Sequence, residues 1–312
     1  MKKRLAICFS GQPRLNRGVW NNFKKNIISP FKDREYEIDC FVHFWRSLSI
    51  PTCYYFGLKE KNAEHLLNSL QNMDIHKYNI FLQSFLEEIN PVDILFDNPL
   101  NTNNYPLKNF KHSKPNTPYN YNSQYHSVKA AHELCRQHEL KHGFKYDYVM
   151  RARTDLNILS LLEYEECSTS HMGVPHSNGH NLGFATSEEI AKGMADPAIR
   201  ESLQRTFRRA HPDHPNKNFD EWTKSLSKVI TFDETHVCND QFAISSSDNM
   251  YKYSQLLDFM INEVNDPDSE VSTGMNTEEG IGIERILWLY INNFCKIKKI
   301  NLLTRIDAHP DI

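Results

Sequence analysis

Short apolar runs that end at glycine, proline or charged residues recur along the first half of the chain. They cover residues 4–9, 36–45, 92–96 and 146–150. A continuous apolar run of this length, closed by such residues, is typical of a strand that is buried on both faces of a sheet. In the second half, a strand and turn are expected at 172–184 and a strand with a polar entry at 239–245.

Other stretches carry their apolar positions at helical spacing. Residues 15–28 are one example, with a single apolar face formed by Leu15, Val19, Trp20, Phe23 and Ile27. Helices are predicted in addition at 63–72, 80–89, 124–142, 190–209, 219–228, 249–263 and 278–294. Strands and helices in this order predict an α/β fold with a Rossmann-like mixed, mostly parallel sheet flanked by helices.

The remaining stretches show little periodicity. Residues 97–123 are rich in Asn, Pro, Tyr and Lys and are expected to form a long irregular loop, a kind of segment that often serves as a lid. Shorter loops are expected at 211–218 and 266–274. Because the 312 residues contain no internal repeat, Gly/Ser linker or long charge run, we expect a single domain with a decorated C-terminal half.

Composition narrows the class of protein. The chain has 36 basic and 39 acidic residues, and this balance disfavours a general nucleic-acid-binding protein. Its seven cysteines form no CxxC pair, which is typical of free thiols in a reducing compartment. No segment approaches the roughly 18 apolar residues that cross a bilayer. The apolar stretch at 5–9 is too short for a signal peptide, so we expect a cytoplasmic protein with no membrane span.

The first strand leads into the turn Ser10-Gly11-Gln12-Pro13-Arg14. Ligands of open α/β sheets bind at the carboxyl ends of the strands. At this place Gly11 would let a ligand approach the backbone, and Arg14 offers a forked donor for phosphate. A tight strand-to-helix turn with a solvated Arg14 explains the same residues, because the motif is neither GxGxxG nor a Walker sequence.

A second polar motif follows the strand at 146–150, where Arg151, Arg153 and Asp155 alternate along the chain. An enzyme that cleaves a sugar–diphosphate bond must offset the negative charge that grows on the leaving diphosphate. A carboxylate that holds Mg²⁺ or Mn²⁺, with arginines beside it, does this. The structural alternative is an Arg–Asp salt-bridge network at a strand end. We favour the functional interpretation, because the position and the residue types agree.

Further candidates stand near other predicted strands. Asp240 precedes the strand at 239–245 and is either a general base for an acceptor hydroxyl or a cap or turn residue. His43 and Trp45 end the strand at 36–45, where they either contact a nucleobase or ribose or belong to the core.

The helix before the second motif supplies two more candidates. Gln124 opens it, and Lys129 is a possible phosphate contact, although a solvated helix lysine is the commoner case. A zinc site at His171, His176 and His180 is disfavoured, since there is no HExxH motif and these residues fall on a predicted loop. Acidic residues at the start of the last helix are assigned to the helix dipole: Glu278, Glu279 and Glu284.

Through these residues the chain resembles glycosyltransferases of the GT-A fold, especially those of a bacterial and large-virus branch. Three motifs carry the resemblance, in the same order over about 235 residues: the turn at 10–14, the segment YDYVMRARTDL at 146–156 and the segment NDQFAIS at 239–245. The resemblance implies a nucleotide-sugar donor and a glycan acceptor, as in polysaccharide biosynthesis. It also implies a nucleotide-binding half at 1–160 and an acceptor-binding half at 161–312.

By the same resemblance, the turn at 10–14 would line the nucleotide pocket, Arg151 and Arg153 would stand beside the diphosphate, and Asp240 would be the base of an inverting enzyme. Asp155 would hold a divalent metal, Mn²⁺ or Mg²⁺. The usual Asp-x-Asp is here Arg153-Thr154-Asp155, so diphosphate and water would complete the coordination. Two alternatives are a non-catalytic GT-A-like glycan-binding or assembly module and a nucleotidyltransferase. The latter normally has a phosphate loop richer in Gly and Lys/Arg at the first strand.

Overall fold

The computed structural model describes residues 2–14, 17–45, 75–98, 100–101, 105–107, 117–158, 160–162, 164, 171–175, 240–264, 266, 268–269, 283–302 and 306–307. Several predicted elements lie outside these residues, namely the helices at 63–72, 190–209 and 219–228 and the loop at 211–218. So do His176, His180, Glu278 and Glu279.

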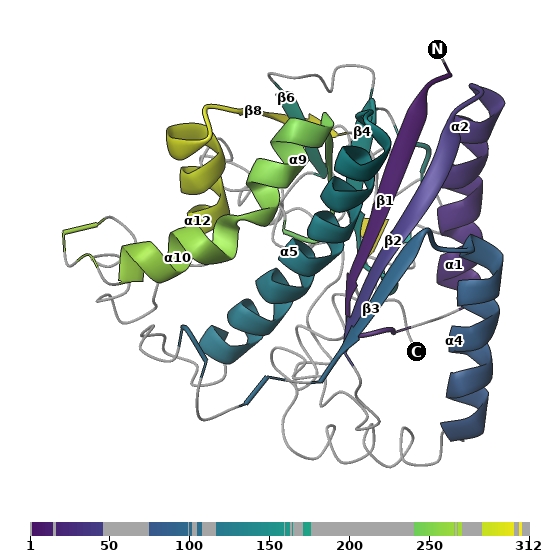
Figure 1. Cartoon of the computed structure of the whole chain (residues 1–312), viewed down its shortest axis with the longest axis horizontal. Helices are drawn as coiled ribbons and strands as arrows, with labels where there is room; N and C mark the ends of the chain where they lie inside the picture. The colour runs from purple at the N-terminus through teal and green to yellow at the C-terminus, as the bar shows by residue number, and fades with distance from the viewer. Residues whose placement is uncertain are drawn as a thin grey trace, which may run out of the picture.

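A seven-stranded sheet forms the centre of the described structure (Figure 1). Its strands are β1 (Arg4–Gly11), β2 (Glu37–Trp45), β3 (Asp93–Asp97), β4 (Tyr148–Ala152), β6 (His171–Pro175), β7 (Ala243–Ser245) and β8 (Lys298–Leu302). They lie in the order β3-β2-β1-β4-β7-β6-β8, and β7 is antiparallel to both of its neighbours while the other pairs are parallel. The predicted mixed, mostly parallel sheet is confirmed. A separate two-stranded sheet pairs β5 (Asn157–Ile158) with β9 (Ile306–Asp307).

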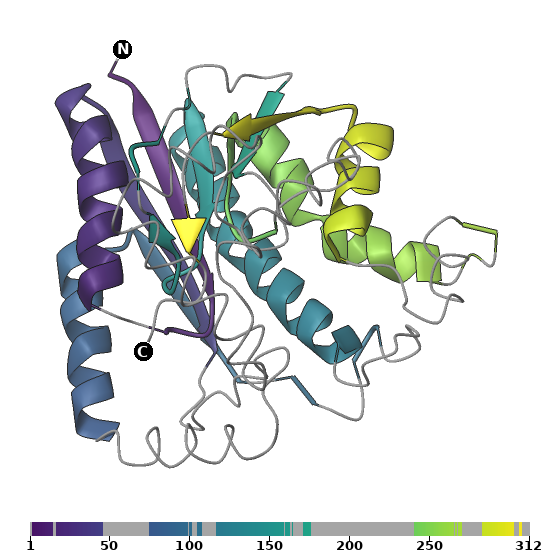
Figure 2. The same cartoon turned by 180° about the vertical axis from the view of Figure 1, so that it is seen from behind.

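Helices cover both faces of the sheet, as Figures 1 and 2 show from opposite sides. One face carries α1 (Arg17–Phe23), a π-helical turn (Lys24–Ile28), α2 (Ser29–Asp33) and α4 (Ile75–Ile89). The other face carries α5 (Thr117–His142), α9 (Ser247–Ser254), α10 (Leu256–Val264) and α12 (Ile283–Leu289), the last continuing into a π-helical turn (Tyr290–Phe294). No helix of the described part of the chain is both long and apolar enough to cross a membrane.

The strands join two cores because alternate side chains point to opposite faces. In β1, Leu5, Ile7 and Phe9 pack with the α1 and α4 side, whereas Ala6 and Cys8 pack with the α5 side. Six consecutive residues of β1, 5–10, are buried, which explains why the strand is a continuous apolar run in the sequence.

The structure corrects three boundaries. Helix α5 begins at Thr117, so the end of the expected loop at 97–123 is helical, with Pro118 in the first turn where a proline is tolerated. The helix expected at 249–263 is two helices that meet at Gln255. There the Ser254 hydroxyl donates to the Tyr251 carbonyl at 2.7 Å, a local bond that competes with the helix. Strand β4 continues to Ala152, so Arg151 lies within the strand and not after it.

The chain order creates a switch point in the sheet. From β1 the chain moves outward to β2 and β3, and it then returns to place β4 on the other side of β1. The carboxyl ends of β1–β4 therefore meet along one side of the sheet, here called the carboxyl edge, with the switch point between β1 and β4. Because β7 runs in the opposite direction, residues 240–242 enter it at the same edge. Ligands of open α/β sheets bind at such a switch point.

Candidate functional site

At the switch point, two loops form an arginine cluster that consists of Gln12, Arg14, Arg153, Thr154 and Asp155. The backbone N–H of Arg14 donates to the Thr154 hydroxyl at 3.0 Å and so ties the loop after β1 to the loop after β4. The Arg14 guanidinium donates to Asp155 at 3.2 Å and to the Gln12 side chain at 3.1 Å. Arg153 binds both oxygens of Asp155, at 2.8 and 2.7 Å.

The charge of Asp155 is stabilised by these arginines. Its side chain is 14% exposed. Burial alone would raise the pKa of the carboxyl, but Arg153 and Arg14 outweigh that effect and lower the pKa below its ordinary value. Two guanidinium groups and one carboxylate leave the cluster with one net positive charge.

Ser10 and Gly11 close β1 beside this cluster. Gly11 has φ of 110°, a backbone conformation that side chains rarely adopt, although a Cβ placed there would meet nothing within 4 Å. The backbone conformation, and not space, therefore requires the glycine. Arg151 is 1% exposed, and its guanidinium contacts the Tyr253 hydroxyl at 3.5 Å. Arg151 is therefore a buried residue within β4 and not a surface arginine at the carboxyl edge.

A carboxylate pair, Asp240 and Glu284, stands where β7 and α12 begin. Gln124 of α5 donates to Asp240 at 2.5 Å, so two residues predicted separately from the sequence meet here. Glu284 is exposed to solvent at the surface, although protein groups surround its carboxyl. Burial, followed by repulsion from Asp240, raises its pKa to about 7. Glu284 therefore titrates near neutral pH, well above the range of an isolated glutamate.

A histidine cluster forms where β2 and β3 end, from His43, Asp97 and His126. The Nε2 atoms of His43 and His126 lie 3.0 and 3.5 Å from the same Asp97 oxygen, Oδ2. The other ring nitrogen of His43 lies 2.6 Å from the Ser127 hydroxyl. Burial lowers the pKa of His43, and hydrogen bonds from His43 and His126 lower the pKa of Asp97.

The remaining sequence-predicted residues take other places. Trp45 is buried and stacks on the His126 ring, with 5.4 Å between ring centroids. Lys129 forms an ion pair with Asp258 of α10 at 2.6 Å, so the structure places it with α10 and not with the arginine cluster.

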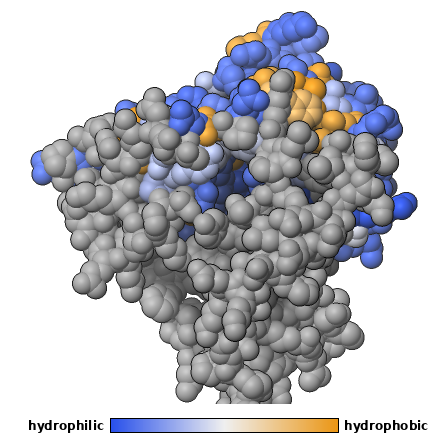
Figure 3. Space-filling view, turned by 90° about the horizontal axis from the view of Figure 1, so that it is seen from below, coloured by the Kyte–Doolittle hydropathy of each residue, from blue (hydrophilic) through white to orange (hydrophobic). Residues whose placement is uncertain are grey.

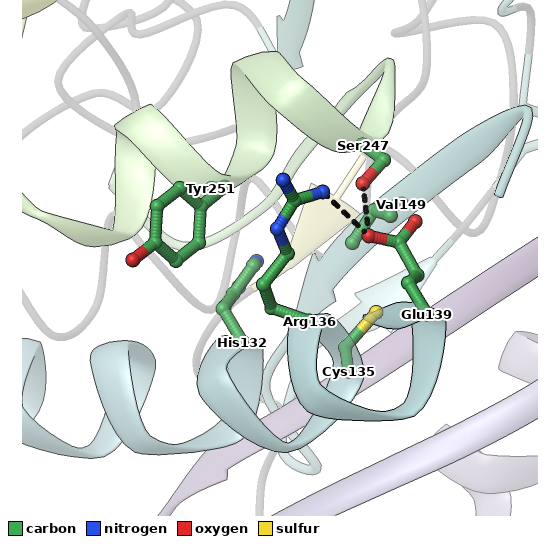
Figure 4. Close-up of a pocket in the computed structure, with 7 residues that line it drawn as sticks. All are labelled: His132, Cys135, Arg136, Glu139, Val149, Ser247 and Tyr251. Carbon is green, nitrogen blue, oxygen red and sulfur yellow. Dashed lines mark hydrogen bonds and ion pairs between the residues drawn. The ribbon is translucent and has the colours of Figure 1, made fainter. Parts of the chain in front are cut away.

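A small pocket lies between α5, α9 and β4, away from the carboxyl edge (Figure 4). The Glu139 carboxylate closes it by accepting hydrogen bonds from Ser247 at 2.8 Å, Arg136 at 3.1 Å and the Tyr146 backbone N–H at 2.9 Å. Tyr146 and Val149 stand at the entry of β4. This network joins structural elements, and we assign it to stability.

Several buried polar atoms at the carboxyl edge have no hydrogen-bond partner among the described residues. They include the Ser10 hydroxyl, the Nε atoms of Arg14 and Arg151, and the Tyr125 hydroxyl. Such atoms are costly unless something polar satisfies them. Figure 3 looks onto this edge, and the described residues in the hollow near its centre are hydrophilic. The arrangement fits a polar ligand at the switch point.

Comparisons with known proteins identify no family. No protein-family model matches the chain, and no curated protein matches it. Among solved structures, the chain is similar to mouse xyloside xylosyltransferase 1 in its apo form, with 10% identity and a TM-score of 0.35 over 96% of this chain and 84% of that one.

The sequence pattern did not predict Asp97 and His126 as residues of the carboxyl edge, and it assigned Glu284 to another role. Asp97 is the last residue of β3, so the strand-end rule that selected His43 also applies to it. His126 lies two positions after Gln124 in α5, but nothing in the local pattern separates it from a surface histidine. Glu284 was assigned to the helix dipole, and only the structure brings it beside Asp240.

Proposed function

We propose that the protein is a glycosyltransferase that moves a sugar from a nucleotide-sugar donor to a hydroxyl acceptor. The observation that carries the proposal is the arginine cluster at the switch point, where Asp155 holds Arg14 and Arg153 together. The resemblance of the three sequence motifs to GT-A glycosyltransferases supports it, since two of them supply this cluster and the third supplies Asp240.

The arginine cluster is suited to a diphosphate. Guanidinium groups bind phosphate oxygens through paired hydrogen bonds and keep their charge at any physiological pH. The Nε of Arg14 has no partner among the described residues, and the net positive charge of the cluster would stabilise a leaving nucleoside diphosphate. Asp155 then acts by fixing both arginines at the edge.

The carboxylate pair is suited to the acceptor. In direct displacement the acceptor oxygen forms a bond to the anomeric carbon, the bond to the diphosphate breaks, and the diphosphate leaves with the electron pair. The hydroxyl proton must pass to a base within hydrogen-bond reach. Asp240 is our candidate. Gln124 orients it, and its charge helps to raise the pKa of Glu284.

The resemblance also implies a divalent metal at Asp155. This fit is poor in the described structure, because both Asp155 oxygens already accept hydrogen bonds from guanidinium groups. The metal role of Asp155 stays a prediction, and we propose instead that the arginines supply the positive charge at the diphosphate.

The test begins with a thermal-shift panel of nucleotide sugars and nucleoside diphosphates, because a ligand selective for the native state raises its apparent stability. Calorimetry with the selected ligand then compares wild type, Arg153→Ala and the control Arg34→Ala, an exposed arginine at the end of α2. Loss of a charged hydrogen bond worth about 1.5–3 kcal/mol should weaken donor and nucleoside diphosphate alike, by roughly 10- to 150-fold, in Arg153→Ala only.

Transfer is then measured as release of nucleoside diphosphate in the presence of acceptors. Asp240→Asn should keep donor affinity and lower transfer by at least about 10²-fold, the contribution expected of a general base. A panel with no selective ligand, or an Arg153→Ala variant with unchanged affinity, would contradict the donor site. Tight donor binding without any transfer would favour the non-catalytic module.

A further inference from the structure

The histidine cluster has no role in the reaction proposed above. Its three side chains come from three separate elements: His43 from the end of β2, Asp97 from the end of β3 and His126 from α5. One ligand-type atom from each lies within 4.8 Å of the other two. Among the described residues, this is the group of His, Cys, Asp and Glu side chains that could hold a metal ion.

We propose that His43, Asp97 and His126 form a binding site for a divalent transition metal of the zinc class. Two ligands at about 2.1 Å from a tetrahedral ion stand about 3.4 Å apart. The Asp97 oxygen lies 3.0 Å from the His43 Nε2 and 3.5 Å from the His126 Nε2, so small side-chain adjustments accommodate the ion. Two imidazoles and one carboxylate leave a coordination position open for water or another ligand.

The ligand set also selects among metals. Mg²⁺ prefers oxygen ligands and keeps several waters, whereas imidazole suits Zn²⁺, Co²⁺ and Fe²⁺. The site therefore differs in place and in preferred ion from the Mg²⁺ or Mn²⁺ site predicted at Asp155.

Ser127 orients His43 for this role. Its hydroxyl donates a hydrogen bond to the His43 carbonyl oxygen at 3.3 Å, and the hydroxyl oxygen can then accept a hydrogen bond from the His43 Nδ1–H at 2.6 Å. When Nε2 carries no proton, its lone pair points at the Asp97 oxygen, and a metal ion there would replace the proton that otherwise links the two atoms. Metal-binding histidines commonly donate their second ring N–H in this way.

The surroundings hold the ligands and leave a path to them. His43 is fully buried, and His126 is stacked against Trp45. The side chains of Asp97 and His126 are 37% and 40% exposed, so an ion can reach them from solvent. The three metal-ligand side chains thus already lie close together, and solvent reaches two of them.

A second histidine pair provides the rival explanation for any metal bound to the protein. His138 and His142 lie one turn apart on α5, with ring centroids 4.4 Å apart. The histidine cluster and the His138–His142 pair share no residue, so substitutions in one group show which of the two binds a metal.

The test uses the full chain stripped with chelator and titrated with Zn²⁺ and with Co²⁺, whose visible absorption reports four-coordinate histidine ligation. Metal content after dialysis and calorimetric affinity are compared for wild type, Asp97→Asn and His126→Ala, with Asp93→Asn on the same strand and His142→Ala on the same helix as controls. Circular dichroism and melting temperature confirm that each variant is folded.

We expect one equivalent of metal in wild type and both controls, and at least a tenfold weaker affinity with loss of the Co²⁺ absorption in Asp97→Asn and His126→Ala. Ser127→Ala should weaken binding about tenfold or more, as removal of an orienting partner does. Absence of stoichiometric binding in wild type overturns the proposal. So does metal that Asp97→Asn and His126→Ala retain, or that His142→Ala loses. None of these readouts depends on sugar transfer, so this proposal and the proposed function fail separately.

Discussion

Asp155 binds two arginines, and its removal should therefore affect stability as well as ligand binding. Asp155→Asn leaves Arg14 and Arg153 without their counter-charge in a largely buried place, which typically costs about 3 kcal/mol of unfolding free energy. The pKa of Asp155 is lowered in the fold. Its contribution is thus present above the ordinary aspartate pKa and is lost as the pH falls through the lowered value.

Urea denaturation at pH 7 and in acid, with exposed Asp33→Asn as control, measures this effect. The difference between Asp155→Asn and wild type should be large at pH 7 and shrink in acid. Wild-type stability together with lost transfer would instead assign Asp155 to the metal role predicted from the sequence.

Glu284 should show the opposite dependence on pH. Its pKa is raised from 4.5 to about 7, first by burial and then by Asp240. A carboxyl with a raised folded pKa keeps its proton longer in the native state than in the unfolded state, so native stability falls as the pH rises from about 4.5 to about 7. Glu284→Gln removes this titration. The melting temperature of the variant, relative to that of wild type, should therefore rise as the pH increases from about 4.5 to about 7. Above pH 7 the difference between the two proteins should stay constant.

Melting temperatures between pH 4 and 8 test the Glu284 prediction, with Glu87→Gln as the control for the loss of one exposed carboxylate. A constant difference between Glu284→Gln and wild type over this range would mean that the pKa of Glu284 is not raised in the folded protein.

Among the structural elements, the end of β1 is a place where backbone conformation limits the sequence. Gly11→Ala should cost about 1–3 kcal/mol because φ of 110° is strained for any residue with a Cβ, although no atom obstructs the added methyl group. Gly18→Ala, in the exposed first turn of α1, should be neutral or stabilising because alanine favours a helix. Equal effects of the two substitutions in denaturant melts would mean that the β1 turn tolerates a side chain.

Apolar runs predicted the central strands well, because a strand that is buried on both faces is a continuous run of apolar residues in the sequence. The start of α5 was missed because its first turns lack apolar spacing, although Thr117 followed by Pro118 is a recognisable start signal. Asp97 and His126 were missed for a different reason. His43 and Asp97 are 54 positions apart, and their meeting depends on the pairing of β2 with β3 and on the packing of α5.

At the scale of the whole molecule, the Glu139 network and the candidate site lie at different edges of the sheet. Glu139 joins α5, α9 and the entry to β4 (Figure 4). Glu139→Ala leaves two buried donors, the Ser247 hydroxyl and the Tyr146 backbone N–H, and the part-buried Arg136 without this acceptor, and we expect a loss of about 3–5 kcal/mol in unfolding free energy. Affinity for the nucleotide ligand should not change in the folded variant. Glu133→Ala on the same helix is the control, and weakened nucleotide binding in folded Glu139→Ala would show that the two edges are coupled.

The antiparallel direction of β7 affects how donor and acceptor specificity are divided along the chain. Because its entry lies at the carboxyl edge, a segment from late in the chain contributes Asp240 beside residues that come from the first 160 positions. Under the proposed function, the early segment would recognise the donor and the late segment the acceptor. Recombination between related genes at the junction near residue 160 could then produce chimaeras that combine the donor of one parent with the acceptor of the other.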